Sequence, residues 1–156
     1  MLKNATFVES CLTNTKGKKA QHGYDVTLKG VKKVGTGGAV MCDKSKTPHY
    51  ESVPAVEGCF VLCKGVYSIT FNEGGEIPKN SSGFFKHRSS VARCGGEIYS
   101  GWYDTGFCCE NFGAILVVHV DSISIEHNAR VAQLLLFASD EASTYDGQWQ
   151  GEKDVK

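Results

Sequence analysis

Three long stretches of the chain alternate apolar and polar residues with a period of two. They read YDVTLKGVKKV at 24–34, CFVLCKGVYSITF at 59–71 and AILVVHVDSISIEH at 114–127, and each is rich in Val, Ile, Thr or aromatic residues. This period predicts β-strands with one buried face. Glycine-rich segments such as GTGG, NEGGEIP and CGGEIYSG separate the runs at turn-like positions. We therefore expect an all-β sandwich or barrel.

One short helix is predicted among these strands. In HRSSVARCG, residues 87–95, Ser89 or Ser90 caps a helix of one or two turns that ends near Gly95. The segment MCDKSKTPHYESVPAVEG, residues 41–58, is polar and interrupted by prolines. It predicts a long loop or an irregular edge.

Length and charge limit both the architecture and the ligands. A chain of 156 residues is enough for one domain. Lys plus Arg equals Asp plus Glu at 17 each, so no basic field is present to hold long nucleic acid. An anionic ligand must therefore be bound by a local cluster of cations, which suits a nucleotide better than a duplex. No apolar run is long enough to span a bilayer, so we expect no membrane partner.

The seven cysteines predict a reducing compartment. Their number is odd and the N-terminal segment MLKNATFVES lacks the apolar core of a signal peptide, which argues against a secreted disulfide framework. Cys108 and Cys109 are adjacent, and Cys59 and Cys63 are separated by three residues; neither spacing is that of a zinc knuckle. We interpret the cysteines as buried reduced thiols rather than metal ligands, and expect a cytoplasmic protein.

Five short segments place polar residues in unusual contexts. Asp104 lies between aromatic residues and glycines, Asp25 interrupts an apolar strand, and cations and hydroxyls gather before Gly95. The segments are GYDVTL (23–28), KHRSSVAR (86–93), SGWYDTGF (100–107), ARVAQLLLF (129–137) and YDGQWQG (145–151).

In this order the segments resemble the motifs of the trimeric dUTPase and dCTP deaminase superfamily, over nearly the whole chain from Gly23 to Gly151. RSSVAR, GWYDTGF, RVAQL and YDGQWQG are most similar to the deaminase-type branch. The resemblance implies a distorted jelly-roll β-barrel, dUTPase-like, over residues 1–144 and a C-terminal arm or lid over residues 145–156. It also implies a homotrimer with active sites at the subunit interfaces.

Asp104 corresponds to the family acid that activates water for attack on the α-phosphate of a deoxynucleoside triphosphate. That role needs a carboxylate within hydrogen-bond reach of the water. Taken alone, Asp104 is better explained as a turn aspartate that bonds backbone amides, and the surrounding motifs reverse that preference. Phe107 corresponds to the aromatic residue that packs on the deoxyribose, with a place in the core as its alternative.

Ser89, Ser90 and Arg93 correspond to the phosphate-binding turn of the family. Hydroxyls and a guanidinium suit phosphate oxygens, although a capped, solvated helix turn also explains the serines. Arg88 belongs to the same candidate substrate-binding segment. The resemblance implies that it supports the site through an ion pair, with Asp25 as the candidate partner.

Gln133 matches the family glutamine near the α-phosphate, and a buried glutamine in so apolar a strand needs a polar partner. Arg130 is a candidate support residue, or a surface residue at the strand end. Tyr145, Gln148 and Trp149 resemble the arm that folds over the nucleotide. The alternative is a tail whose tryptophan packs on its own domain.

The choice between the two reactions of the superfamily depends on one further residue. Its deaminases carry a proton-transferring glutamate on the strand after the third motif. When the chain is aligned from Asp104 without a gap, that position holds Ala114. When a short insertion is allowed in CCENFG, it holds Val118. Neither transfers a proton, so the resemblance favours hydrolysis of dUTP to dUMP and pyrophosphate.

The resemblance implies Mg²⁺ as the cofactor, carried by the triphosphate and not by direct protein ligands. Backbone groups of the hairpin 99–112 are expected to read the uracil. Three alternatives stay open: a dCTP deaminase or bifunctional enzyme that uses Glu110 or another acid, a nonenzymatic nucleotide-binding trimer, and a structural jelly-roll subunit such as a capsid protein.

Overall fold

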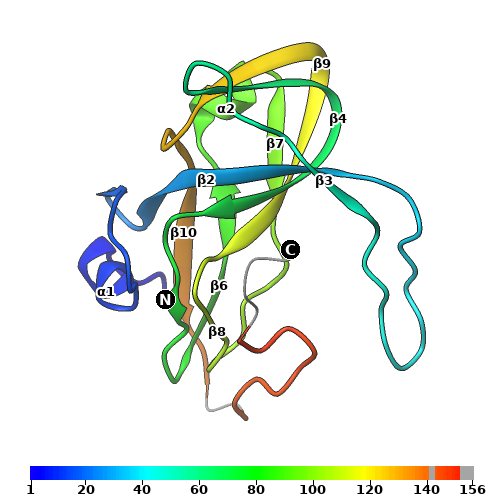
Figure 1. Cartoon of the computed structure of the whole chain (residues 1–156). Helices are drawn as coiled ribbons and strands as arrows, with labels where there is room; N and C mark the ends of the chain where they lie inside the picture. Colours follow the sequence, from blue (N-terminus) through cyan, green and yellow to red (C-terminus); the bar gives the residue numbers. More distant parts are fainter. Residues whose placement is uncertain (141–142, 152–156) are drawn as a thin grey trace.

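Antiparallel strands are the main regular structure of the protein, as the computed structural model in Figure 1 shows. The structure describes residues 1–140 and 143–151. Its helices and strands are α1 (Ala5–Ser10), β1 (Lys18–Lys19), β2 (Tyr24–Val34), β3 (Tyr50–Ser52), β4 (Cys59–Phe71), β5 (Gly75–Glu76), β6 (Ser81–His87), α2 (Ser89–Arg93), β7 (Gly96–Tyr99), β8 (Cys108–Cys109), β9 (Gly113–Glu126) and β10 (Arg130–Ala138).

The main sheet curls until its two ends approach one another. Six of its eight strands follow the order β6-β10-β2-β4-β9-β7, and the other two, β1 and β3, pair with β2; β5 and β8 form a separate two-stranded sheet. The end strands are linked where Phe85 N–H donates to Ser100 Oγ (2.8 Å) and Ile98 N–H donates to His87 Nδ1 (3.4 Å). The all-β barrel prediction is therefore confirmed, and the sheet is nearly closed.

The three alternating stretches become the longest strands. β2 and β4 have the predicted bounds, and β9 begins and ends one residue earlier than predicted. The predicted helix is α2, but the predicted serine cap is wrong: the N-cap is Arg88, no side chain caps the helix, and Ser89 and Ser90 form its first turn. The structure adds a second short helix, α1, whose N-cap Asn4 accepts a hydrogen bond from Phe7 N–H through Oδ1 at 2.9 Å.

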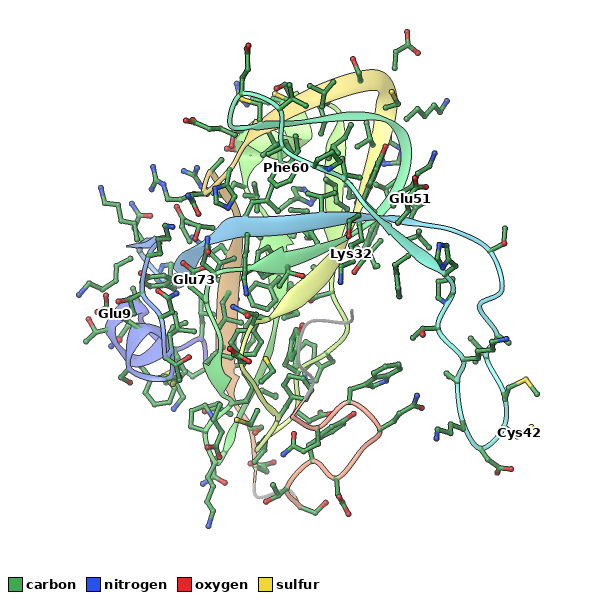
Figure 2. The ribbon with its side chains drawn as sticks, viewed as in Figure 1. Glu9, Lys32, Cys42, Glu51, Phe60 and Glu73 are labelled. Carbon is green, nitrogen blue, oxygen red and sulfur yellow. The ribbon has the colours of Figure 1, made fainter. Side chains whose placement is uncertain are left out.

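The segment 41–58 is largely irregular, as predicted, but contains the short strand β3. Residues before β3 form a long hairpin that projects from the barrel, with Cys42 at its far end (Figure 2). Its base is held where Gly35 N–H donates to His49 O at 2.8 Å, and its arms meet at Ala39 and Lys46.

Aromatic rings in the barrel interior support the segment that follows β7. Phe71 packs on Phe85 with ring centroids 4.8 Å apart, and Phe85 packs on Phe112 at 5.5 Å. Tyr103 then packs on Phe107 at 5.1 Å. These rings extend the core from β4 and β6 into the segment around Asp104, so its backbone is anchored by burial.

Most cysteines do not match the prediction of buried thiols. Cys109 is buried, whereas Cys42, Cys63, Cys94 and Cys108 are exposed. These four cysteines lie on the outer surface, so they do not act as small apolar side chains that fill the core. Within residues 1–140 and 143–151, no His, Cys, Asp or Glu side chains gather into a group of three that could hold a metal ion. In the same part of the chain, no helix is long and apolar enough to cross a membrane.

A fully buried carboxylate, Glu73, joins the N-terminal segment to β2 (Figure 2). Its Oε1 accepts a hydrogen bond from Gly17 N–H and its Oε2 accepts one from Thr27 N–H, both at 2.8 Å. The Thr27 hydroxyl donates to the same carboxylate at 3.0 Å. A buried charge is tolerated only with such partners.

Glu73→Gln is expected to destabilise the fold by about 1–3 kcal/mol, because the amide nitrogen would face a buried donor and leave it without an acceptor. Urea unfolding would show a lower midpoint with an unchanged slope. The exposed Glu51, changed to Gln in the same way, is the matched control. Equal midpoints for the two variants would contradict the anchoring role of Glu73.

Candidate functional site

Asp25 is the centre of a polar cluster on one wall of the barrel. It lies on β2 and its residue is only 5% exposed. Its Oδ2 accepts from Arg88 Nε at 3.0 Å and from Arg130 Nη1 at 3.2 Å, and its Oδ1 accepts from Gln133 Nε2 at 3.2 Å. A buried carboxylate requires such compensation.

The sheet register explains why these residues meet. Gln133 is directly opposite Asp25 across the β10–β2 pair, so the two side chains project from the same face. The ion pair between Arg88 and Asp25 that the resemblance implied is present, and Gln133 has a polar partner. Arg130 also bonds Asp25 although its side chain is 40% exposed, so it is both a strand-end residue and part of the cluster.

A hollow of about 630 Å³ opens over this cluster. Five cationic side chains line it together with the single carboxylate of Asp25, namely those of Lys18, Lys19, Lys86, Arg88 and Arg130. Ser89 is also in the lining, whereas the exposed Ser90 and Arg93 are not. Because the whole chain has no net charge, this wall is a local concentration of positive charge that suits an anion.

A second cavity, of about 370 Å³, is formed by the segment that follows β7 and the outer face of the neighbouring strands. Tyr103, Phe107 and Asn111 line it, together with Trp149 from the C-terminal segment. The Tyr103 hydroxyl donates to Gly113 O at 2.6 Å and fixes the ring. Phe107 is only 7% exposed, so it belongs to the core and to the cavity wall at once.

Asp104 is exposed and directly precedes the buried turn at Thr105 and Gly106, which leads to Phe107 in the wall of the second cavity. Phe107 N–H donates to Asp104 O at 3.1 Å, and Gly106 has a φ of +79°, which a residue with a side chain adopts only with strain. The neighbouring Thr105 is buried and its hydroxyl donates to Ser81 O at 2.7 Å. The turn is therefore fixed on both sides of the carboxylate.

One chain does not bring all the predicted residues together. The hollow and the second cavity have no lining residue in common, and Asp104 lines neither. The structure thus unites Asp25, Arg88, Arg130 and Gln133 in one group, and Phe107 and Trp149 in another.

The C-terminal segment folds back over the turn that carries Asp104. Tyr145 N–H donates to Thr105 O at 2.8 Å, and its ring packs on Phe107 with centroids 5.4 Å apart. Trp149 packs against the core and lines the second cavity. Gln148 lies apart from that cavity and donates to Ser45 O at 3.1 Å in the projecting hairpin. Residues 152–156, the end of the predicted arm, lie outside the described residues.

Gln150 is a residue that sequence reasoning did not select. Its Nε2 donates to Gly106 O at 2.8 Å, and its Oε1 accepts from Cys108 N–H at 3.1 Å. A side-chain amide that bonds both a carbonyl and an N–H of one turn fixes the backbone of that turn. The only available signal was its place in the quoted segment YDGQWQG, directly after Trp149.

A second missed group is at the edge of the second cavity. Tyr99 lines the cavity, and its hydrogen bond to Glu97 lowers the pKa of that carboxyl, with smaller contributions from His119 and His87. The same hydrogen bond raises the pKa of the Tyr99 hydroxyl. His119 Nε2 lies 3.4 Å from the Glu97 carboxylate. Glu97, Tyr99 and His119 lie at the surface, where solvent weakens hydrogen bonds and ion pairs between them.

The two residues that the resemblance aligns with the deaminase glutamate, Ala114 and Val118, are both apolar. Val118 is 1% exposed and packs in the core. Ala114 lines the second cavity but has no group that transfers a proton. Glu110 is exposed and does not line that cavity.

The nearly closed antiparallel barrel, with its cationic hollow and separate aromatic cavity, places the protein in the class of β-barrel proteins. Within that class, the chain belongs to the dCTP deaminase-like family, whose model matches residues 6–139. The expected superfamily membership is thereby confirmed.

Two relatives from Methanosarcina species are named probable deoxyuridine 5'-triphosphate nucleotidohydrolases. That of Methanosarcina mazei is 30% identical over 136 residues, which cover 84% of this chain and 80% of the relative. That of Methanosarcina acetivorans is 30% identical over an alignment of 157 residues, covering 97% and 88%.

Solved structures with the same fold include members of both branches. The dCTP deaminase of Agrobacterium tumefaciens superimposes with a TM-score of 0.64 at 12% identity and covers 86% of this chain; this chain spans 47% of that deaminase. The EIAV dUTPase superimposes with a TM-score of 0.57 at 16% identity, covering 95% of this chain and 98% of the dUTPase. At these identities the likeness concerns the fold alone.

Proposed function

We propose that this protein is a dUTP diphosphatase, which hydrolyses dUTP to dUMP and pyrophosphate. The proposal depends on the two cavities, the cationic hollow and the second cavity, occurring together in this chain. The chain is also 30% identical, over most of its length, to relatives named probable deoxyuridine 5'-triphosphate nucleotidohydrolases. The cationic hollow suits a triphosphate and the aromatic cavity suits a nucleoside.

The second cavity is the proposed nucleoside site. Phe107 packs against the deoxyribose and leaves no space for a 2′-hydroxyl, while backbone groups of the segment 99–112 read the base. Trp149 and Tyr145 cover the site, and Gln148 belongs to the same arm. Two observations support this assignment: the Tyr145 ring packs on Phe107, and Trp149 lines the same cavity as Phe107. Residues 1–144 then form the barrel domain, and 145–156 its lid.

The hollow is the proposed phosphate site. Gln133 donates one amide hydrogen to Asp25, and the second hydrogen remains for an oxygen of the α-phosphate. Ser89 supplies a hydroxyl in its lining, and Ser90 and Arg93 of the same helix are proposed to supply a further hydroxyl and a guanidinium to the phosphates. Arg88 and Arg130 are held by Asp25 and bring positive charge to the wall.

Mg²⁺ enters as part of the substrate, as the Mg·dUTP complex. The lining of the hollow fits this assignment, since its one carboxylate, Asp25, is already bonded by Arg88, Arg130 and Gln133 and has no position for a metal ion. When bound, the ion neutralises charge on the triphosphate oxygens. Asp104 accepts the proton of the attacking water.

The complete site forms between copies of the chain, in a homotrimer. Two observations support this arrangement: the two cavities share no residue, and Asp104 lines neither of them within one chain. The hollow of one copy then faces the second cavity and Asp104 of the next copy. An assembly three times the mass of the 16.9 kDa chain is expected in solution.

A product screen tests the proposed function. With dUTP, dCTP, dTTP and UTP in Mg²⁺, we expect pyrophosphate from dUTP, little turnover of UTP and no ammonia from dCTP. Chelation of Mg²⁺ by EDTA is expected to abolish turnover, and added Mg²⁺ to restore it. Ammonia from dCTP would make the protein a deaminase instead. Nucleotide binding without pyrophosphate release would make it a nonenzymatic binding trimer.

A further inference from the structure

A row of four side chains crosses the wall of the hollow. Lys18 of β1 is directly opposite Asp25 of β2, Asp25 is opposite Gln133 of β10, and Gln133 is opposite Lys86 of β6. Residues paired in this way on antiparallel strands project from the same face of the sheet. The hydrogen bond between Gln133 and Asp25 confirms that face for the inner two, and all four line the hollow.

Within the residues that the structure describes, the two inner members of the row form hydrogen bonds or ion pairs with other side chains of the hollow, and the two outer lysines form no ion pair. Asp25 bonds Arg88, Arg130 and Gln133. Lys19 pairs with Glu9 at 2.9 Å. Within the residues that the structure describes, Lys18 and Lys86 have no ion pair, and both are exposed. Among the described residues, the hollow therefore holds two lysines that form no ion pair with a carboxylate.

The position of Lys18 is fixed by the chain before it. Gly17 passes so close to the backbone of β2 that a Cβ there would overlap Asp25 O. Its N–H is also held by the buried Glu73 at 2.8 Å. These contacts keep the two-residue strand β1 against β2, so a flexible ammonium group stands at the edge of the hollow on a rigid base.

We propose that Lys18 and Lys86 bind the β- and γ-phosphates of the substrate, and afterwards the pyrophosphate product, at the two ends of the row. The inference rests on the proposed function, in which Gln133 at the centre of the row contacts the α-phosphate. An ammonium group on a long flexible stem serves several phosphate positions as a point charge. Lys18 lies outside all five sequence motifs, so the sequence alone does not assign it to the site.

Calorimetric titration of the full chain tests the inference with inorganic tripolyphosphate and, separately, with dUMP. Lys18→Gln and Lys86→Gln are each expected to weaken tripolyphosphate binding about five- to tenfold, and to leave dUMP binding within about twofold. Lys18→Arg is expected to retain most of the tripolyphosphate affinity. Lys64→Gln, an exposed lysine on β4 outside the hollow, is the matched control.

Tripolyphosphate affinities of the Lys18 and Lys86 variants equal to that of Lys64→Gln would overturn the inference, as would a parent protein that does not bind tripolyphosphate. Equal losses for tripolyphosphate and dUMP, accompanied by a lower melting temperature, would also overturn it in favour of a purely structural role. The test is independent of turnover. A protein that binds tripolyphosphate through these lysines but does not hydrolyse dUTP would refute the proposed function and leave the phosphate site standing.

Discussion

Asp104→Asn is expected to lower kcat for dUTP hydrolysis by about 10²- to 10⁴-fold, the usual contribution of a general base. Asparagine has nearly the same shape but does not accept the proton of the attacking water. The fold tolerates the change, because the turn uses the backbone oxygen of Asp104 and the side chain is exposed. Pyrophosphate release at saturating dUTP measures the effect.

Binding of a non-hydrolysable dUTP analogue is expected to stay within about twofold in the same variant, since the lost step is proton transfer and not ground-state binding. Asp121→Asn, an exposed aspartate on β9, is the matched control and is expected to retain the parent kcat. Unchanged turnover in Asp104→Asn would refute its assignment as the base.

Two inactive variants are expected to restore activity when they are mixed. Ser89→Glu places a carboxylate in the cationic hollow, where it repels phosphate, and a glutamate in the first turn of α2 is favourable for the helix. Ser89→Glu alone is expected to lose most of its kcat/KM through a higher KM. Asp104→Asn retains an intact hollow.

Suppose that each site takes its hollow from one copy and Asp104 from the next. In a random 1:1 mixture, half of the hollows carry the parent Ser89 and half of the neighbouring copies carry the parent Asp104. About a quarter of the sites then have both parent residues, so about a quarter of the parent activity is expected. The subunits are mixed in mild denaturant and refolded together, and pyrophosphate release is assayed. Each variant refolded alone is the control. No recovery in a mixture shown to contain mixed trimers would place the whole site within one chain.

Local pattern predicted the long strands because alternation is set by each residue and its immediate neighbours. β2, β4 and β9 follow their period-two stretches closely, and α2 forms where a short helix was predicted, although its N-cap is Arg88 and not a serine. The short strands β1, β3, β5 and β8 have two or three residues each. Such segments carry too little pattern to be recognised, and their pairing partner decides whether they are strands.

Some residues of the candidate site were predicted from the sequence, and others were missed. The motif order led to Asp25, Arg88 and Gln133, and their contact follows from it once the family resemblance is accepted. Gln150 and Lys18 were not found. Each acts through a partner distant in sequence, Gln150 through the turn at Gly106 and Lys18 through the register with Asp25.

The sequence by itself determined the strand-rich class of the fold, the absence of a general basic field, and the order of the motifs, because alternation, composition and spacing are properties of the linear chain. Only the tertiary structure decided which charges lie on one wall. Three strand pairings bring Lys18, Asp25, Gln133 and Lys86 into a row, and a single-residue slip in any pairing would turn part of that row to the opposite face. Register is fixed by packing of the whole barrel.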